Sequence, residues 1–140
     1  MTKNITILLI ISLVFIACGG DNPRNTVKDF VGAVLVDDSM VIDSLVDWEK
    51  MITSRLEEMS PEDSAKSFTY YKNEFFKSLV DNGKRRQNYL NSQIVIGKGD
   101  VEGDRAEVEL SFIDKTTGIQ NYTKVVLVKK TEGWKIIYFY

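Results

Sequence analysis

Carboxylate and tyrosine side chains are the groups of this chain best suited to acid–base chemistry. Its 140 residues include no histidine, which removes the commonest general base and most zinc and copper sites. Carboxylates and tyrosines could in principle still pair as acid–base groups, but nothing in their spacing singles out one pair. We therefore predict no catalytic residue, no metal site and no cofactor. The candidates for such a pair are Tyr70, Tyr71 and Tyr89 with Asp43, Asp47 or Asp114.

Large aromatic side chains recur in both halves of the chain and could line a pocket for a lipid or another apolar ligand. At helical and strand spacing, however, such residues more often form a plain hydrophobic core. Both interpretations are kept at this point. The tentative pocket residues are Phe30, Trp48, Phe68, Tyr71, Phe75, Phe112 and Trp134.

Charged residues gather in two places. Glu57-Glu58 and Glu62-Asp63 flank an expected helix junction, where acids are common, and their spacing is too wide for a calcium site. Lys84-Arg85-Arg86 could contact anionic lipid headgroups, but its position favours a solvated stretch just past a helix end. The formal net charge of the chain is −2. No basic stripe with interleaved aromatic residues is present, so we expect no nucleic-acid partner.

The first 17 residues have the three parts of a secretory signal peptide. Lys3 gives a cationic start, an apolar run extends from Ile5 to Ile16, and the small residue Ala17 ends it. A membrane-spanning helix needs about 20 apolar residues, and this run stops sooner, at a polar, turn-rich stretch that begins with Cys18. We therefore expect a cleaved export signal rather than a membrane span.

Phe15-Ile16-Ala17-Cys18 resembles the bacterial lipobox, in which a small residue precedes the modified cysteine, although Phe15 departs from the usual leucine. The resemblance implies a diacylglycerol on the Cys18 sulfur, cleavage after Ala17 and an acyl chain such as palmitate on the new N-terminus. Several acyl chains together give stable membrane anchoring. The alternative is an ordinary signal peptide with a free cysteine at its cleavage site. Cys18 is the only cysteine, so no internal disulfide can form.

Gly19 follows this cysteine, at the position where an aspartate favours retention in the inner membrane of enteric-type bacteria. We therefore expect the chain in the bacterial cell envelope. If the host has two membranes, the periplasmic face of the outer membrane is favoured.

Apolar residues of the first half recur with a helical period. Residues 27–35 have them at i, i+3, i+4, i+7 and i+8, one face of a helix, with Asn22 or Asn25 as its cap. Residues 40–46 suit a short helix, and residues 48–59 suit another amphipathic one. These segments predict a helical layer at the start of the folded domain.

Ser60-Pro61-Glu62-Asp63 has the residue types of a helix start: a capping serine, a proline in the first turn and acids near the positive end of the dipole. We predict a longer helix from Ser60 to Leu79. Asn82-Gly83 should end it.

The second half changes to a two-residue period. Residues 94–96 suit a short strand, followed by a glycine-containing loop from Gly97 to Gly103. Residues 106–112 alternate apolar and polar side chains, which is typical of a half-buried strand. Two further strands, 122–130 and 134–140, follow after turns.

Helices followed by a four-stranded antiparallel meander predict an α+β domain, with the helices on one face of a curved sheet. We divide the chain into a signal peptide (1–17), a lipidated tether (18–25) and a single domain (26–140). Residues 125–128 and 136–140 are apolar on both faces. We therefore expect the outer face to be covered too, by a second subunit or by a wrapping helix.

Three short motifs resemble small bacterial lipoproteins of the cystatin-like, nuclear-transport-factor-two-like superfamily. They are the helix 26–33, the strand 103–108 and the closing Gly-Trp-Lys-Ile at 133–136, and the likeness covers most of residues 24–140. The resemblance implies a cone-shaped fold, with a long helix packed into a bent sheet, often with an apolar pocket and dimerisation through the sheet. It implies no specific activity, because this superfamily includes enzymes, binding modules and assembly domains.

We therefore expect a membrane-anchored envelope lipoprotein with a non-enzymatic domain that binds an apolar small ligand or an envelope protein. A small enzyme of the cyclase or isomerase type, with a tyrosine–carboxylate pair in the cone, is the first alternative. A structural lipoprotein that assembles through its sheet face is the second. The expected partners are the membrane, through the anchor, and a second copy of the chain, through the sheet.

Overall fold

The computed structural model describes residues 22–60, 62 and 67–140. The helices come first along the chain and the strands follow. The helices are α1 (Pro23–Leu35), α2 (Ser39–Leu45), α3 (Trp48–Glu58), α4 (Phe68–Leu79) and α5 (Lys84–Asn91). The strands are β1 (Ser92–Glu102), β2 (Arg105–Asp114), β3 (Gln120–Lys130) and β4 (Gly133–Phe139).

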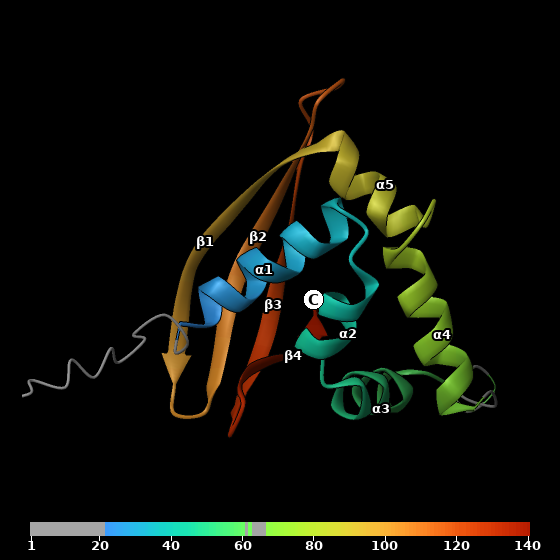
Figure 1. The fold of residues 1–140 in the computed structure, drawn as a ribbon, viewed down its shortest axis with the longest axis vertical. Helices are drawn as coiled ribbons and strands as arrows, with labels where there is room; N and C mark the ends of the chain where they lie inside the picture. The colour runs from blue at the N-terminus through green and yellow to red at the C-terminus, as the bar shows by residue number, and fades with distance from the viewer. Residues whose placement is uncertain (1–21, 61, 63–66) are drawn as a thin grey trace, which may run out of the picture.

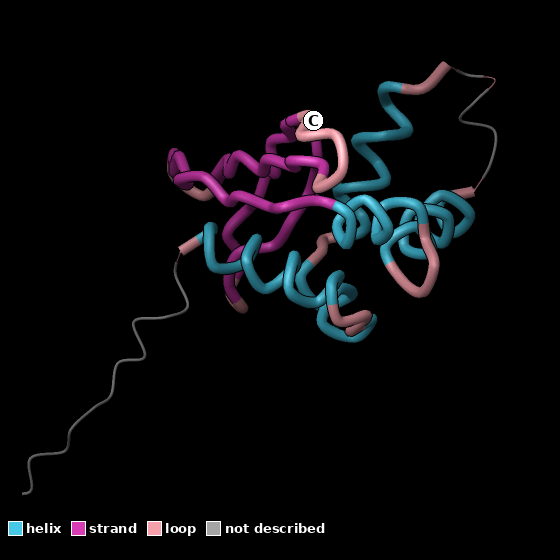
Figure 2. The backbone as a smooth tube through the Cα atoms, turned by 90° about the horizontal axis from the view of Figure 1, so that it is seen from above, coloured by secondary structure: helices cyan, strands magenta, loops and turns pink. Residues whose placement is uncertain are grey.

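The sheet is an antiparallel meander in the order β1-β2-β3-β4. α1 crosses its inner face, and α2 to α5 continue around one side (Figure 1). Seen from above, strands and helices form two separate groups (Figure 2). The predicted α+β class, with helices against a four-stranded meander, is confirmed.

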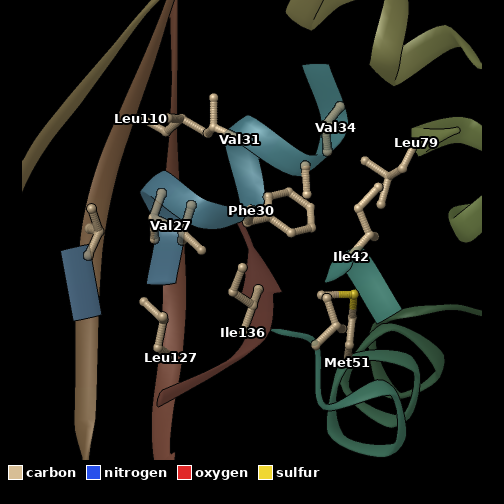
Figure 3. Close-up of a cluster of buried hydrophobic side chains, with 14 of the residues drawn as sticks. Val27, Phe30, Val31, Val34, Ile42, Met51, Leu79, Leu110, Leu127 and Ile136 are labelled. Atoms are coloured by element: carbon tan, nitrogen blue, oxygen red, sulfur yellow. The ribbon is translucent and has the colours of Figure 1, made fainter. Parts of the chain in front are cut away.

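α1 supplies the central layer of the core. Asn22 caps it by accepting a hydrogen bond from the Arg24 backbone N–H, 2.9 Å away, and Pro23 occupies the first turn. Its apolar stripe is buried between the sheet and the other helices (Figure 3). The buried residues in this view include Val27, Phe30, Val31 and Val34 of α1, Leu110, Leu127 and Ile136 of the sheet, and Ile42, Met51 and Leu79 of the remaining helices.

The start of α1 is fixed to a bulge in β1. The Arg24 guanidinium donates to the carbonyl oxygens of Ile96 (3.1 Å) and Gly97 (3.1 Å). At Gly99 a Cβ atom would lie 3.2 Å from the Pro23 ring, so glycine gives the helix room to approach. The predicted loop from Gly97 to Gly103 is wrong. β1 continues through this segment to Glu102. The register shifts between Ile96 and Gly99, and Arg24 provides donors for the carbonyl groups at this shift.

The predicted helix start at Ser60 is also wrong. α4 begins at Phe68, and the Ser67 hydroxyl caps it by accepting from the Tyr70 backbone N–H. Residues 61 and 63–66 lie outside the described residues, as does part of the predicted acidic cluster.

Lys84-Arg85-Arg86 is not a solvated stretch past a helix end but the first turn of α5. Arg86 donates to the carbonyl oxygens of Val34 (2.8 Å), Leu35 (3.0 Å) and Asp81 (2.8 Å). Its side chain therefore provides donors for the last carbonyl groups of α1, where the helix leaves carbonyl groups without intrahelical partners. α5 was missed because this polar contact and one buried side chain, that of Tyr89 against Phe30, attach it to α1 and leave no apolar stripe in the sequence.

The outer face of the sheet is partly covered within the chain. Val126 is fully buried although its neighbours in β3 point into the core. Tyr138 pairs with Val126 across the ladder, and its hydroxyl donates to the Glu58 carboxylate of α3 over 2.5 Å. A parallel bridge between Val46 and Ile136 covers part of the β4 edge. The wrapping-helix alternative therefore holds for this corner of the sheet.

None of the described helices is long and apolar enough to cross a membrane. The predicted signal peptide, the cleavage after Ala17 and the lipidation of Cys18 fall on residues 1–21, outside the described residues. α1 begins at Pro23, so residues 23–25, which we assigned to the tether, are helical.

Candidate functional site

A cavity of about 660 Å³ lies between α3, α4, α5 and the sheet. Its volume is within the range of small-molecule sites. Because strands β2, β3 and β4 contribute residues from the same end of the sheet, the cavity occupies one end of the domain. It is lined by Arg55, Phe75, Ser78, Leu79, Lys84, Arg85, Asn88, Tyr89, Phe112, Asn121, Tyr122, Thr123, Phe139 and Tyr140.

One face of α5 forms a wall of this cavity. Lys84, Arg85, Asn88 and Tyr89 lie at i, i+1, i+4 and i+5, so a single side of the helix presents them. Tyr89 is buried, and its ring contacts that of Phe112 with centroids 5.0 Å apart. Burial raises the pKa of Tyr89, which keeps its hydroxyl neutral at physiological pH.

Phe75 of α4 is the centre of the aromatic wall. Its ring contacts Trp48 edge-on with centroids 6.1 Å apart, and Phe139 with centroids 6.0 Å apart. The guanidinium carbons of Arg55 and Arg85 each lie 4.6 Å from the Phe75 ring centroid. The aromatic wall of the cavity therefore carries two cations.

The tentative pocket residues divide into three groups. Phe75 and Phe112 line the cavity. Phe30, Trp48 and Trp134 are instead buried in the core, because their strand and helix positions face the centre of the domain. Phe68 and Tyr71 lie outside the cavity lining, near the start of α4, where Phe68 is 38% exposed.

Sequence reasoning missed the polar half of the lining. Arg55, Arg85 and Asn121 come from α3, α5 and β3, and only the folded chain brings them together. The aromatic pattern gave a signal for the walls, and the basic run 84–86 gave one for Lys84 and Arg85, although its position favoured a solvated stretch. Arg55 and Asn121, which are isolated in sequence, gave none.

The carboxylates proposed for an acid–tyrosine pair have structural partners. Asp43 accepts from the Trp48 indole N–H over 2.9 Å. Asp47 caps α3 and forms an ion pair with Lys130. Asp114 accepts the backbone N–H groups of the turn that follows β2, which lowers its pKa.

The tyrosine–carboxylate pair that does form joins Tyr138 to Glu58, and the sequence did not single it out. The hydrogen bond first, and then burial, raise the pKa of Tyr138. Both side chains line a separate groove with Ser54, Arg105 and Ile137 rather than the main cavity. This pair therefore bridges α3 and β4 and does not face the main cavity.

No grouping of three or more metal-ligating side chains occurs in residues 22–60, 62 and 67–140. The polar groups that converge on the cavity are cations, amides and hydroxyls, which do not form a set of ligands for a metal cation.

No protein-family model and no curated protein sequence matches the chain. Solved structures do. A candidate NTF2-like transpeptidase from Campylobacter jejuni aligns with a TM-score of 0.53 and 16% identity, over 83% of this chain and 97% of the other. A candidate ketosteroid isomerase from Shewanella frigidimarina aligns with a TM-score of 0.54 and 19% identity, over 86% and 95%. At these identities the likeness establishes the fold, which agrees with the cone-shaped architecture expected above. The chain has the nuclear-transport-factor-two-like fold.

Proposed function

We propose that this chain is an envelope lipoprotein whose domain binds an apolar small ligand without transforming it. The cavity of about 660 Å³ carries this proposal. Its walls include Phe75, Leu79, Phe112 and Phe139, and apolar walls with a few polar groups are typical of ligand sites.

Binding without catalysis is favoured by the side chains that face the cavity. No aspartate or glutamate is among the lining residues in the described part of the chain. The Tyr138–Glu58 pair, which resembles the pair expected of an isomerase, lies in a different groove. An acid–base step in the cavity would therefore lack a side-chain carboxylate.

Native mass spectrometry of the protein purified from its own host tests the ligand. We expect a bound species in the mass range of a lipid or another apolar metabolite. As a control, replacement of Leu79 by Trp should fill part of the cavity and reduce the bound fraction. A ligand-free wild-type protein would contradict the proposal.

The membrane anchor rests on the leader, which ends in Phe15-Ile16-Ala17-Cys18. Replacement of Cys18 by Ala should abolish labelling with an alkyne fatty acid and release the protein from membranes. Replacement of Ser12 by Ala, within the same leader, is a matched control that should leave both unchanged. Unaltered fractionation of Cys18→Ala would show that the chain is not a lipoprotein.

Dimerisation through the sheet stays a prediction. Val95 is 46% exposed on β1, on the opposite face from Ile94 and Ile96, which pack against the core. A charge introduced at Val95 should disfavour a contact between copies through this face of the sheet. Light scattering of the wild type and of Val95→Glu would test it.

A further inference from the structure

Two guanidinium groups share one aromatic ring in the cavity. Arg55 of α3 and Arg85 of α5 each lie 4.6 Å from the centroid of Phe75, and all three residues line the cavity. The ring holds each cation by its electron-rich face. Two positive charges are thus concentrated on one wall.

This arrangement is unfavourable without a counter-charge. Burial first, and then the charge of Arg85, lower the pKa of Arg55, although Tyr138 and Glu58 act in the opposite direction. In addition, Arg55 Nε is buried and has no hydrogen-bond partner among the described residues. A buried donor without an acceptor is rare in folded proteins. Arg55 therefore has a buried donor without an acceptor and lies beside a second cation.

No side-chain carboxylate among the described lining residues compensates these charges. Lys84 adds a third cation to the lining, and the carboxylate of Glu58, which acts on Arg55, accepts a hydrogen bond from Tyr138 outside the cavity. Unsatisfied positive charge at a concave site marks a place where an anion would bind.

We propose that the ligand is an amphiphile with one anionic headgroup, which Arg55 and Arg85 bind while its apolar body lies against Leu79, Phe112 and Phe139. The guanidinium fork matches a carboxylate or a phosphate. The headgroup can therefore come from a fatty acid or from a lysophospholipid. This inference rests on the proposed ligand-binding function of the same cavity and specifies its substrate class.

Fluorescence titration of the full mature chain (18–140, with Cys18→Ser) tests the headgroup. The probes are cis-parinaric acid and its methyl ester, which share an acyl chain and differ in charge. We expect the acid to bind about tenfold tighter or more, the factor expected of a hydrogen bond to a charged group. Displacement by oleate and by lysophosphatidic acid then identifies the preferred headgroup, and either preference supports an anion site.

The variants Arg55→Gln, Arg85→Gln and the double variant should lose the preference for the acid and bind the ester as the wild type does. Unchanged ester binding also shows that each variant is folded. Lys98→Gln is the matched control, because Lys98 is an exposed cation on β1 outside the cavity lining.

Two negative results are distinguishable. If the acid and the ester bind equally, or if the double variant keeps the preference, the anion site is wrong while a ligand-binding cavity remains. If neither probe binds to the wild type, the amphiphile is wrong, and the native mass spectrum of the protein from its host then decides whether the proposed ligand-binding function fails with it.

Discussion

The Asp47 carboxylate, which is 8% exposed, forms an ion pair with the Lys130 ammonium and so connects the start of α3 to β3. The same side chain caps α3 by accepting the Lys50 backbone N–H over 3.1 Å. Burial alone would raise the pKa of Asp47, but these hydrogen bonds and the lysine charges lower it overall. One carboxylate therefore positions the helix that carries Arg55.

Replacement of Asp47 should reduce stability at neutral pH. Asp47→Ala loses the cap and the ion pair and should cost about 2 kcal/mol, since a cap alone is worth about 0.5–2 kcal/mol. Asp47→Asn keeps a capping oxygen and should cost less. Urea denaturation of both variants measures the difference, and an Asn variant less stable than the Ala variant would contradict the capping role.

The effect of Asp47 should depend on pH in a defined direction. Because its pKa is lower in the folded state than the ordinary value of 3.8, its contribution is complete above that value and is lost as the pH falls through the folded-state pKa. The stability difference between the wild type and Asp47→Asn should therefore shrink in acid, below about pH 4. Urea midpoints at a series of pH values test this, and a difference that grows in acid would contradict it.

Arg85 and Arg86 are adjacent in the sequence, but Arg86 stabilises the fold whereas Arg85 lines the cavity. Arg86→Gln should lower the free energy of unfolding by about 2–3 kcal/mol, which is the contribution typical of a hydrogen bond from a charged group. The reason is that the carbonyl oxygens of Val34 and Leu35 lose the guanidinium as their donor. Arg85→Gln should leave stability unchanged or raise it, because it removes a charge that repels Arg55. Thermal unfolding of the two variants compares them directly, and equal losses would show that Arg85 is structural.

Two glycines offer a second matched pair. At Gly83, which joins α4 to α5, a Cβ atom would lie 2.3 Å from the carbonyl oxygen of Lys77, so Gly83→Ala should cost about 1–3 kcal/mol. At Gly32, on the exposed side of α1, a Cβ atom would meet nothing within 4 Å. Gly32→Ala should stabilise the domain by about 0.5–1 kcal/mol, because alanine favours the helix. Chemical denaturation tests whether the free energy of unfolding falls for Gly83→Ala and rises for Gly32→Ala.

The sequence predicted those elements that obey a simple period. The apolar stripe of α1 and the alternation of β2 follow directly from burial on one face, so their limits were nearly correct. α5 and the second half of β1 were not predicted, because polar contacts of Arg86 and Arg24, rather than a periodic apolar pattern, stabilise them. A long cationic side chain that reaches carbonyl groups dozens of residues away leaves no periodic trace in the sequence.

The aromatic residues of the candidate site could be predicted from the apolar periodicity, whereas the roles of its cations could not. Phe75 and Phe112 belong to periodic elements and were expected at a pocket. The role of Arg55 and Arg85 is visible only in the folded chain, where α3 and α5 bring both guanidinium groups to the Phe75 ring. Arg55 has no distinguishing sequence neighbours, and Arg85 belongs to the basic run 84–86, which the sequence pattern favoured as a solvated stretch past a helix end.

Because α1 is attached to β1, the position of a lipid anchor would determine which end of the domain lies near the tether. Five peptide links join Cys18 to Pro23, so a lipidated Cys18 would hold that end of α1 within about 18 Å, at about 3.6 Å per residue. Pro23 lies against Gly99, whereas Phe112 at the cavity pairs with Ile94, nearer the other end of β1. In an anchored chain the cavity would therefore lie at the end of the domain opposite the tether.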